Sequence, residues 1–496
     1  MSEAKQLYRI LNKGGVLSPS LLAKILKLAG DAGNRHVMLG SRQDILFFSP
    51  ENEFNNETGI SIQKRSSGFQ NVVSSYVCVD ILPSTNWVNS GTYLNVLDQF
   101  TTDHLLRVNI VDPRQNLVPL FYGHLNFIAS ETPNYWHLYL NLNPEKDPQN
   151  WSGLIFTDDI AAFAQTLETL IVEQKITEPE KLFGKISGSP LQRNTLESAA
   201  KISLPAGFFP YYEGLNKIDG KSLYWAGFYW RNNQYPIQFL NEICDLCQRT
   251  NVGKISFTPW KTFLIKDIEA KDKIHWDELI GRYGINMRHS SFELNWHLPL
   301  LDLQALKLKR FLVAEFDKFD IRTFGLSFAI QNKLGERFTT VVIRSKSRLS
   351  FLRKFDFTRT YSIEHAYDFN PNNNHYIEFA AGLSKSELPQ SISELTKRYY
   401  TRLFVQNKPG QVSRQDEPKR KTQLVHQCPD CLTIYDERYG DVLANIAAGI
   451  PFSLLPDSYS CPVCETSKSA YAEIEITETN LTQSLLHNSA GWLWQV

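Results

Sequence analysis

The chain of 496 residues repeats part of itself once, without a gap, at an offset of 218 residues (240 − 22 = 218). Residues 22–29 match residues 240–247, and residues 37–47 match residues 255–265. Each copy places an apolar stripe at helical spacing before two alternating segments that meet at a corner of two or three residues. Because a unit present only twice does not build a solenoid, the repeat predicts a duplicated body with pseudo-two-fold symmetry.

Further α/β sequence follows each copy of the repeat. An apolar helical face runs through residues 158–175, behind Thr157 as a candidate N-cap, and a second one runs through residues 301–319. We therefore predict a mixed α+β body in four pieces, which span residues 1–75, 76–205, 206–280 and 281–405.

A polar segment separates this body from the C-terminal region. Residues 406–423 contain no aromatic residue and one aliphatic residue, a composition that is typical of a solvated linker. The sequence then predicts a small domain over residues 424–476 and a tail over residues 477–496. The tail ends in the apolar run Trp492-Leu-Trp494, which we expect to dock either on the body or on a partner.

Composition narrows the classes of protein to consider. Lys and Arg together number 52, as do Asp and Glu, so the net charge is near zero and we expect neither nucleic acid nor a membrane as a partner. No apolar run has the length of a signal peptide or a membrane span, so we expect a cytoplasmic protein. The composition does not indicate an oligomeric state.

Two cysteine pairs near the C-terminus are the strongest chemical signal. Cys428-Pro-Asp-Cys431 and Cys461-Pro-Val-Cys464 are separated by 29 residues (460 − 432 + 1 = 29). Four thiolates at such spacing form a tetrahedral site that suits iron or zinc. In a cytosolic protein, paired cysteines more typically bind a metal than form disulfides. The spacing alone leaves both metals open.

The residues around these cysteines resemble rubredoxin over the whole domain. The resemblance is carried by residues 434–436, 440–441, 446, 449, 452, 455–457, 461–464, 468 and 471. It implies a one-electron carrier with a single iron on Cys428, Cys431, Cys461 and Cys464, shielded by a small aromatic core. Leu432 and Glu465 stand where the family has glycine after each pair, and zinc remains the alternative metal.

The body resembles the duplicated ferredoxin-like and sirohaem domains of nitrite and sulfite reductases over about residues 5–400. The patches that carry the resemblance are residues 14–18, 39–43, 71–73 and 257–261. The resemblance implies ferredoxin-like halves at 1–75 and 206–280 and sirohaem-domain halves at 76–205 and 281–405. It also implies that Arg42 and Gln43, with Lys261 at the corresponding corner, contact the carboxylates of sirohaem. The residues alone support two interpretations of Arg42 equally, a sirohaem ligand or a surface arginine at a strand corner.

The cluster of that family is missing from this sequence. The family holds an iron–sulfur cluster on four cysteines after the second copy, whereas no cysteine lies between Thr258 and Gln427. Cys78 lies in an alternating segment typical of a strand, Cys244 and Cys247 lie on an apolar helical face, and all three are expected to be buried thiols. Six-electron reduction by the family mechanism therefore lacks its electron supply.

These features support three hypotheses of different classes. The first is an electron carrier, a rubredoxin tethered to a cluster-less scaffold, with a redox protein as donor and another as acceptor. The second is a divergent oxidoreductase whose body still binds sirohaem and receives electrons from its own rubredoxin. The third is a structural zinc protein that mediates interactions.

Overall fold

A computed structural model describes most of the chain. The described residues are 5–50, 61–143, 146–197, 202, 204–205, 207–212, 214–283, 285, 294–331, 338–347, 359–406, 422–429, 434–435, 437, 440–441, 444, 446–447, 449–461 and 466–477. The chain divides into two compact units, Met1–Phe404 and Val405–Val496. We refer to the first unit as the body.

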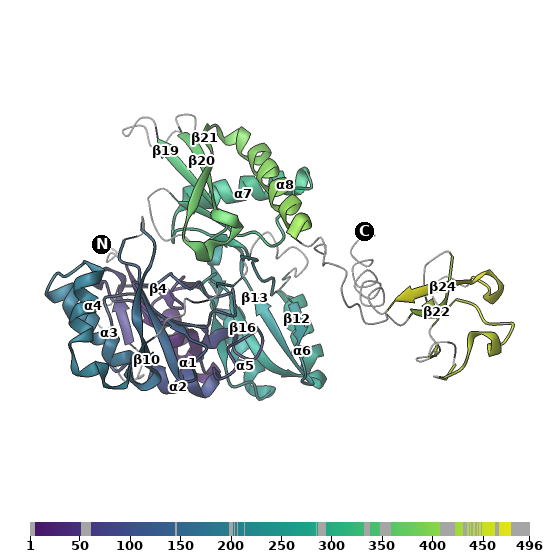
Figure 1. Ribbon diagram of the computed structural model, residues 1–496, viewed down its shortest axis with the longest axis horizontal. Helices are drawn as coiled ribbons and strands as arrows, with labels where there is room; N and C mark the ends of the chain where they lie inside the picture. Colours follow the sequence, from purple (N-terminus) through teal and green to yellow (C-terminus); the bar gives the residue numbers. More distant parts are fainter. Residues whose placement is uncertain are drawn as a thin grey trace. The chain divides into compact units, whose positions relative to one another are not determined.

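The body alternates helices and strands along the chain (Figure 1). Its helices are α1 Pro19–Asp31, α2 Ser90–Asp98, α3 Ile160–Glu168, α4 Pro179–Ser187, α5 Ile237–Arg249, α6 Lys273–Arg282, α7 Leu303–Lys318 and α8 Leu388–Gln406. Its strands are β1 Gln6–Leu11, β2 Val16–Leu17, β3 His36–Leu39, β4 Ile45–Ser49, β5 Ser61–Lys64, β6 Val73–Ser74, β7 Val108–Val111, β8 Leu125–Ala129, β9 Tyr135–Leu140, β10 Gln149–Phe156, β11 Leu196–Glu197, β12 Gly214–Lys217, β13 Leu223–Phe228, β14 Tyr235–Pro236, β15 Ile255–Phe257, β16 Phe263–Glu269, β17 Trp296–His297, β18 Phe328–Gln331, β19 Val341–Ser347, β20 Arg359–Ala366 and β21 Tyr376–Leu383.

The structure confirms the duplication at the offset read from the sequence. Helix α1 starts and ends 218 residues before α5 (237 − 19 and 249 − 31), and the corner between β3 and β4 corresponds to that between β15 and β16. Ser18 caps α1 through its hydroxyl, which accepts the N–H of Leu21 at 3.2 Å. The apolar faces of α1 and α5 share one core, in which Cys244 and Cys247 are buried. Each of the two helices therefore shields the apolar face of the other from solvent.

The two copies also exchange a strand. The first sheet has the order β14-β3-β4-β1-β5, and the second has the order β12-β13-β16-β15-β2. Strand β2 thus pairs with β15 of the second copy, and β14 pairs with β3 of the first. Because each sheet ends in a strand of the other copy, neither sheet is complete alone.

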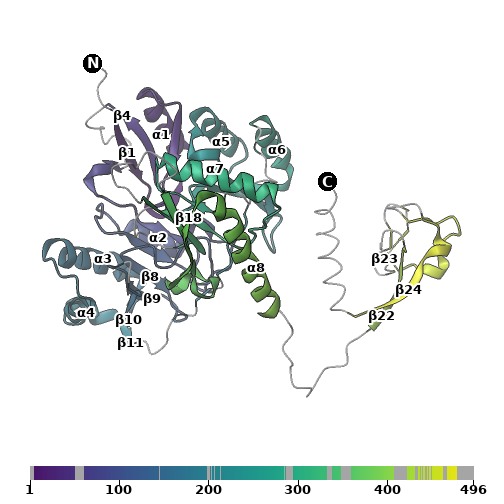
Figure 2. The ribbon, with the colours of Figure 1, turned by 90° about the horizontal axis from the view of Figure 1, so that it is seen from above.

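A second pair of sheets repeats a single topology. In β6-β7-β8-β9-β10 and in β17-β18-β19-β20-β21, the first two pairings are parallel and the next two are antiparallel. Strand β11 extends the former sheet. Helices α7 and α8 lie beside the latter sheet (Figures 1 and 2), and their apolar residues share one core with it. The body is thus a duplicated α+β fold.

Two local expectations need correction. Thr157 does not cap the helix that follows it, because its hydroxyl donates to the carbonyl of Asn134 and accepts the indole N–H of Trp136. Cys78 is buried as expected, but it lies in a 3-10 turn, Ser75–Cys78, and not in a strand. A 3-10 turn, Thr157–Asp159, separates Thr157 from the start of α3 at Ile160, and alternation in sequence does not distinguish the 3-10 turn of Cys78 from a strand.

The second unit contains a small antiparallel sheet of order β23-β22-β24. Its strands are β22 Thr422–Gln427, β23 Ile434–Tyr435 and β24 Ala472–Thr477. The predicted tail beyond Thr477 and nearly all of the predicted linker lie outside the described residues. Within the described part of the chain, no helix is both long enough and apolar enough to cross a membrane.

Candidate metal centre and the corners of the body

The described cysteines of the second unit are buried. Cys428 directly follows β22 and has no exposed surface, and Cys461 is 1% exposed. The backbone N–H of Cys461 donates to the carbonyl of Thr466 at 2.8 Å, and Ser460 and Ser467 form a β-bridge beside it. Cys431 and Cys464 lie outside the described residues, as do Leu432 and Glu465.

An aromatic cluster fills the interior of this small unit. Tyr435 and Tyr459 are buried, and Phe452 and Tyr471 pack against them. The Tyr435 hydroxyl donates to the carbonyl of Ile450 at 2.6 Å. Burial, and after it the sulfur of Cys461, raises the pKa of Tyr471 far above its ordinary value. The rings therefore form a dry interior next to a cysteine, as the sequence predicts.

Two polar contacts fix the loop that leads to the second cysteine pair. The Tyr459 hydroxyl donates to a carboxylate oxygen of Asp441 at 2.8 Å. The ammonium of Lys468 donates to the carbonyl of Leu455 at 2.6 Å. Both contacts join the loop before Cys461 to distant parts of the unit, so they limit how far this cysteine can move.

The donor chemistry fits a thiolate-ligated metal. Cys428 and Cys461 are both buried in one unit that is too small to rely on its apolar core alone. Buried sulfur ligands beside apolar rings suit iron or zinc. The described residues by themselves contain no group of three or more His, Cys, Asp or Glu side chains that could hold a metal ion, because half of the predicted set is outside them.

The corners of the two copies in the body have the same backbone geometry. Gln43 and Lys261 correspond at the repeat offset, and their φ angles are +59° and +60°. The backbone N–H of Gly40 donates to the carbonyl of Asp44 at 2.8 Å. In the second copy, the backbone N–H of Thr258 donates to the carbonyl of Thr262, also at 2.8 Å. A left-handed residue other than glycine costs roughly 1–2 kcal/mol. The packing of each corner therefore holds it in this conformation.

Arg42 lies inside the body and not on its surface. Its side chain is 3% exposed, and its guanidinium donates to Oδ1 of Asn109 at 2.7 Å and to the carbonyls of Asn71 and Val108 at 2.8 Å each. Burial lowers its pKa to about 9. The guanidinium thus joins the corner to the segment before β6 and to β7.

Gln43 makes a similar connection to β6. Its amide nitrogen donates to the carbonyl of Ser74, and its amide oxygen accepts the N–H of the same residue, both at 2.9 Å. Lys261, at the matching corner, is partly buried and donates to the carbonyl of Leu298, just after β17. Each corner therefore reaches the first strand of the neighbouring sheet.

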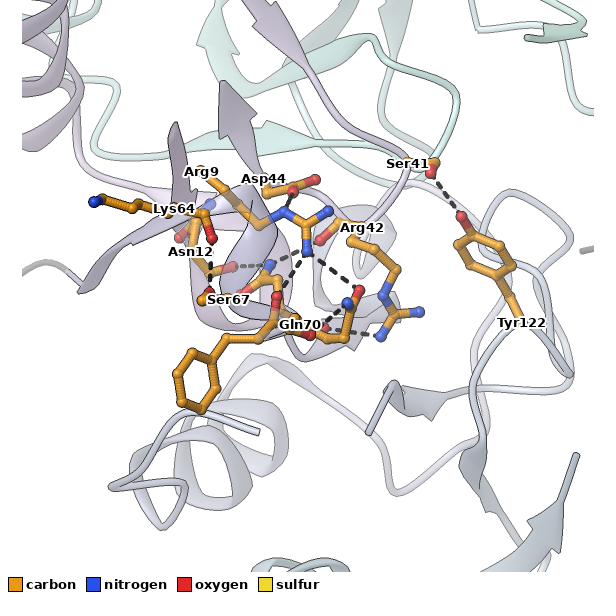
Figure 3. A network of polar contacts seen from close by, with 12 residues as sticks. Arg9, Asn12, Ser41, Arg42, Asp44, Lys64, Ser67, Gln70 and Tyr122 are labelled. Atoms are coloured by element: carbon orange, nitrogen blue, oxygen red, sulfur yellow. Dashed lines mark hydrogen bonds and ion pairs between the residues drawn. The ribbon is translucent and has the colours of Figure 1, made fainter. Parts of the chain in front are cut away.

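A buried ion pair under the first corner was missed by the sequence reasoning. Nε of Arg9 lies 2.7 Å from Oδ2 of Asp44, which is 1% exposed. Arg9 also donates to the carbonyl of Phe69. Figure 3 shows its contact with the side chain of Gln70 and, nearby, the contact of Ser41 with Tyr122. No sequence signal marks this pair, because its members lie 35 residues apart (44 − 9), Arg9 on β1 and Asp44 directly before the paired strand β4.

His124 faces a second arginine, Arg107, which is half-buried. Its Nε2 lies 2.9 Å from a guanidinium nitrogen of Arg107, and its Nδ1 accepts the backbone N–H of the same residue at 3.2 Å. Burial, followed by the charges of Arg107 and Arg42, lowers the pKa of His124 to about 3. The folded body therefore holds this imidazole neutral.

This site predicts a pH dependence of stability. The folded pKa of about 3 lies below the ordinary value of 6.5, so the unfolded chain binds the proton first. Stability is therefore highest above pH 6.5 and falls as the pH drops towards 3, by about 1.4 kcal/mol per pH unit from this group. We expect His124→Gln to flatten the dependence of the unfolding free energy on pH between 6.5 and 4.5, measured by urea denaturation. An unchanged slope would contradict this assignment.

Comparison with known proteins identifies the C-terminal unit. The Rubredoxin family model matches residues 425–471. The probable rubredoxin HupI of Bradyrhizobium diazoefficiens is 45% identical over 49 residues, which are 10% of this chain and 71% of HupI. Rubredoxin-1 of Chlorobaculum tepidum is 44% identical over 46 residues, which are 9% of this chain and 67% of that protein. The chain belongs to the rubredoxin family through this domain, a class of electron-transfer proteins in which cysteines hold iron.

A longer relative carries a matching segment. The anaerobic nitric oxide reductase flavorubredoxin of Escherichia coli (strain K12 / DH10B) is 38% identical over 48 residues, which are 10% of this chain and 10% of that protein. Rubredoxin-like sequence therefore also occurs as a small part of a longer redox protein.

A solved structure shares the fold of the body. The NirA protein of Mycobacterium tuberculosis matches with a TM-score of 0.59 and 13% identity, over 79% of this chain and 81% of NirA. The resemblance to nitrite and sulfite reductases is thus confirmed at the level of the fold.

Proposed function

We propose that the protein transfers single electrons through one iron held by Cys428, Cys431, Cys461 and Cys464, and that the NirA-like body is a docking scaffold without a cluster. The observation that carries this proposal is the burial of Cys428 and Cys461 beside aromatic rings in a rubredoxin domain. Its partners are then one redox protein that donates an electron and another that accepts it.

Iron on four thiolates supplies a one-electron couple when it is bound. The residues of the chain set the surroundings of that couple. Tyr435, Phe452 and Tyr459 provide an apolar environment in the same unit as the buried Cys428 and Cys461. The contact of Lys468 with Leu455 holds the loop that carries the second cysteine pair.

The thiols of the body support the absence of a cluster there. Burial raises the pKa of Cys78 to about 12 and that of Cys244 to about 12, and it raises that of Cys247 further. Such thiols stay protonated at neutral pH, whereas a cluster needs thiolates. Three cysteines in two halves of the body also fall short of the four that the cluster usually takes.

Iron and acid-labile sulfide should therefore be measured together on the full chain purified from its own host. We expect about one iron per chain and negligible sulfide, because the four C-terminal cysteines hold a single metal. Sulfide near four per chain would contradict the scaffold without a cluster. Zinc in place of iron, with no reversible one-electron wave in voltammetry, would favour the structural zinc protein.

A further inference from the structure

A cavity of about 120 Å³ opens on the body beside the second corner. Its walls include Trp230, Trp260 and Trp296, which come from three different segments. Trp260 and Trp296 are each 5% exposed, so they belong to the wall and not to the rim. On the rim, Leu301 is 53% exposed and Leu303 is 69% exposed. The cavity is thus lined in part by aromatic side chains and has exposed apolar residues at its edge.

Two lysines give this aromatic cavity a positive charge. Lys261 and Lys309 both line it, and Lys309 is 8% exposed. Asp302 also lines the cavity, but its carboxylate accepts the N–H groups of Gln304 and Ala305 at the start of α7. Among the described residues, no carboxylate lies within ion-pair distance of the Lys261 ammonium, which donates to the carbonyl of Leu298.

The charge of Lys261 remains at neutral pH, and the part of the chain that the structure describes forms no ion pair with it. Burial, followed by the charge of Lys309, lowers the pKa of Lys261 to about 8, so the ammonium form still predominates at pH 7. An ammonium has three N–H donors, and one carbonyl uses one of them. A partly buried charge without a partner is costly, and an anion in the cavity would relieve that cost.

The volume sets the size of such an anion. An apolar cavity of about 150 Å³ holds a benzene molecule. A cavity of about 120 Å³ that is open on one side therefore admits a single aromatic ring. It does not admit the four linked rings of a tetrapyrrole without rearrangement of its walls.

We propose that this cavity binds a small aromatic carboxylate of the benzoate class. The ring lies between the tryptophan side chains, and the carboxylate accepts hydrogen bonds from the Lys261 ammonium. Aromatic stacking contributes to affinity, and the charge-assisted hydrogen bond selects the carboxylate over neutral rings. This site lies wholly within the body and does not depend on the metal of the rubredoxin domain.

The first copy of the repeat supplies a suitable variant. Gln43 occupies the corresponding corner with nearly the same φ angle, so Lys261→Gln places there a residue that this backbone conformation already accepts. Lys307→Gln is the matched control, because Lys307 is exposed on α7 and does not line this cavity. 4-Fluorobenzamide has nearly the same shape as 4-fluorobenzoate but no negative charge. Comparing how tightly the two bind therefore tests the contribution of the ligand's charge without any change to the protein.

Binding to the full chain is measured by ¹⁹F NMR titration at pH 7. We expect 4-fluorobenzoate to bind saturably with one molecule per chain. Both Lys261→Gln and replacement of the ligand by 4-fluorobenzamide should weaken binding at least tenfold. The control Lys307→Gln should leave the affinity for 4-fluorobenzoate unchanged. The proposal is wrong if binding does not saturate, if the amide binds equally well, or if Lys261→Gln, still folded by circular dichroism, binds as the wild type does. Tight binding of uroporphyrin with no saturable 4-fluorobenzoate binding would overturn it in favour of a larger anionic ring.

Discussion

Replacement of Cys461 by serine is expected to reduce the iron content from about one per chain to near zero and to abolish the one-electron wave. The Cys461 sulfur is buried, and a serine hydroxyl neither ionises at neutral pH nor binds iron as a thiolate does. Metal binding contributes on the order of 10–16 kcal/mol to the folding of small thiolate domains. The C-terminal unit should therefore lose its structure together with its metal.

The matched control is Cys244→Ser in the body. Cys244 is also a buried thiol, at 1% exposed, but it lies on the apolar face of α5. We expect this variant to keep about one iron per chain and to lose only a modest part of the stability of the body. The measurements are elemental analysis, voltammetry and far-ultraviolet circular dichroism. Iron retained by Cys461→Ser, or iron lost by Cys244→Ser, would show that the ligand set is assigned incorrectly.

Local sequence pattern was sufficient for the duplication and for the type of domain at the C-terminus. The apolar stripe of residues 22–29 and its counterpart at 240–247 predicted two helices whose bounds differ by the repeat offset. The buried faces of those helices also identified Cys244 and Cys247 as core residues. Such predictions succeed because helical periodicity is contained within a single segment.

Pairing between distant segments could not be read in the same way. The exchange of β2 and β14 between the two sheets involves strands of two residues each, which are too short to show alternation. The ion pair of Arg9 with Asp44 depends on the register of β1 against β4. Register is fixed by the assembled core, so neither feature has a local signature.

The two corners show how similar sequence positions diverge in role. Arg42 and Trp260 occupy corresponding positions of the repeat. The Arg42 guanidinium donates to three protein oxygens. The Trp260 indole instead donates to the carbonyl of Leu117 at 2.8 Å. Both side chains join a corner to a neighbouring segment. Both residues lie in the sequence patches that carry the resemblance, but the sequence did not distinguish a cofactor ligand from an internal connection.

The role of Arg42 can be separated from cofactor binding by its effect on stability. Arg42→Ala removes the donors to Asn109 Oδ1 and to the carbonyls of Asn71 and Val108. Buried acceptors left without a partner each cost about 1–3 kcal/mol, so the loss of all three bonds costs at least about 3 kcal/mol. Arg42→Lys keeps the charge but not the planar fork, so we expect a smaller loss for it.

Arg42→Ala is therefore expected to lower the free energy of unfolding of the body by at least about 3 kcal/mol and to leave the visible spectrum unaltered. The matched control is Arg114→Ala, which breaks the exposed pair of Arg114 with Glu131 and should change stability by less than about 1 kcal/mol. Urea denaturation followed by tryptophan fluorescence measures the first effect, and absorption spectra of the native proteins measure the second. The opposite pattern, with stability unchanged and a tetrapyrrole band lost in Arg42→Ala, would make Arg42 a cofactor ligand. The divergent oxidoreductase would then replace the scaffold as the function of the body, because a guanidinium that served a bound tetrapyrrole could not be the internal connection described here.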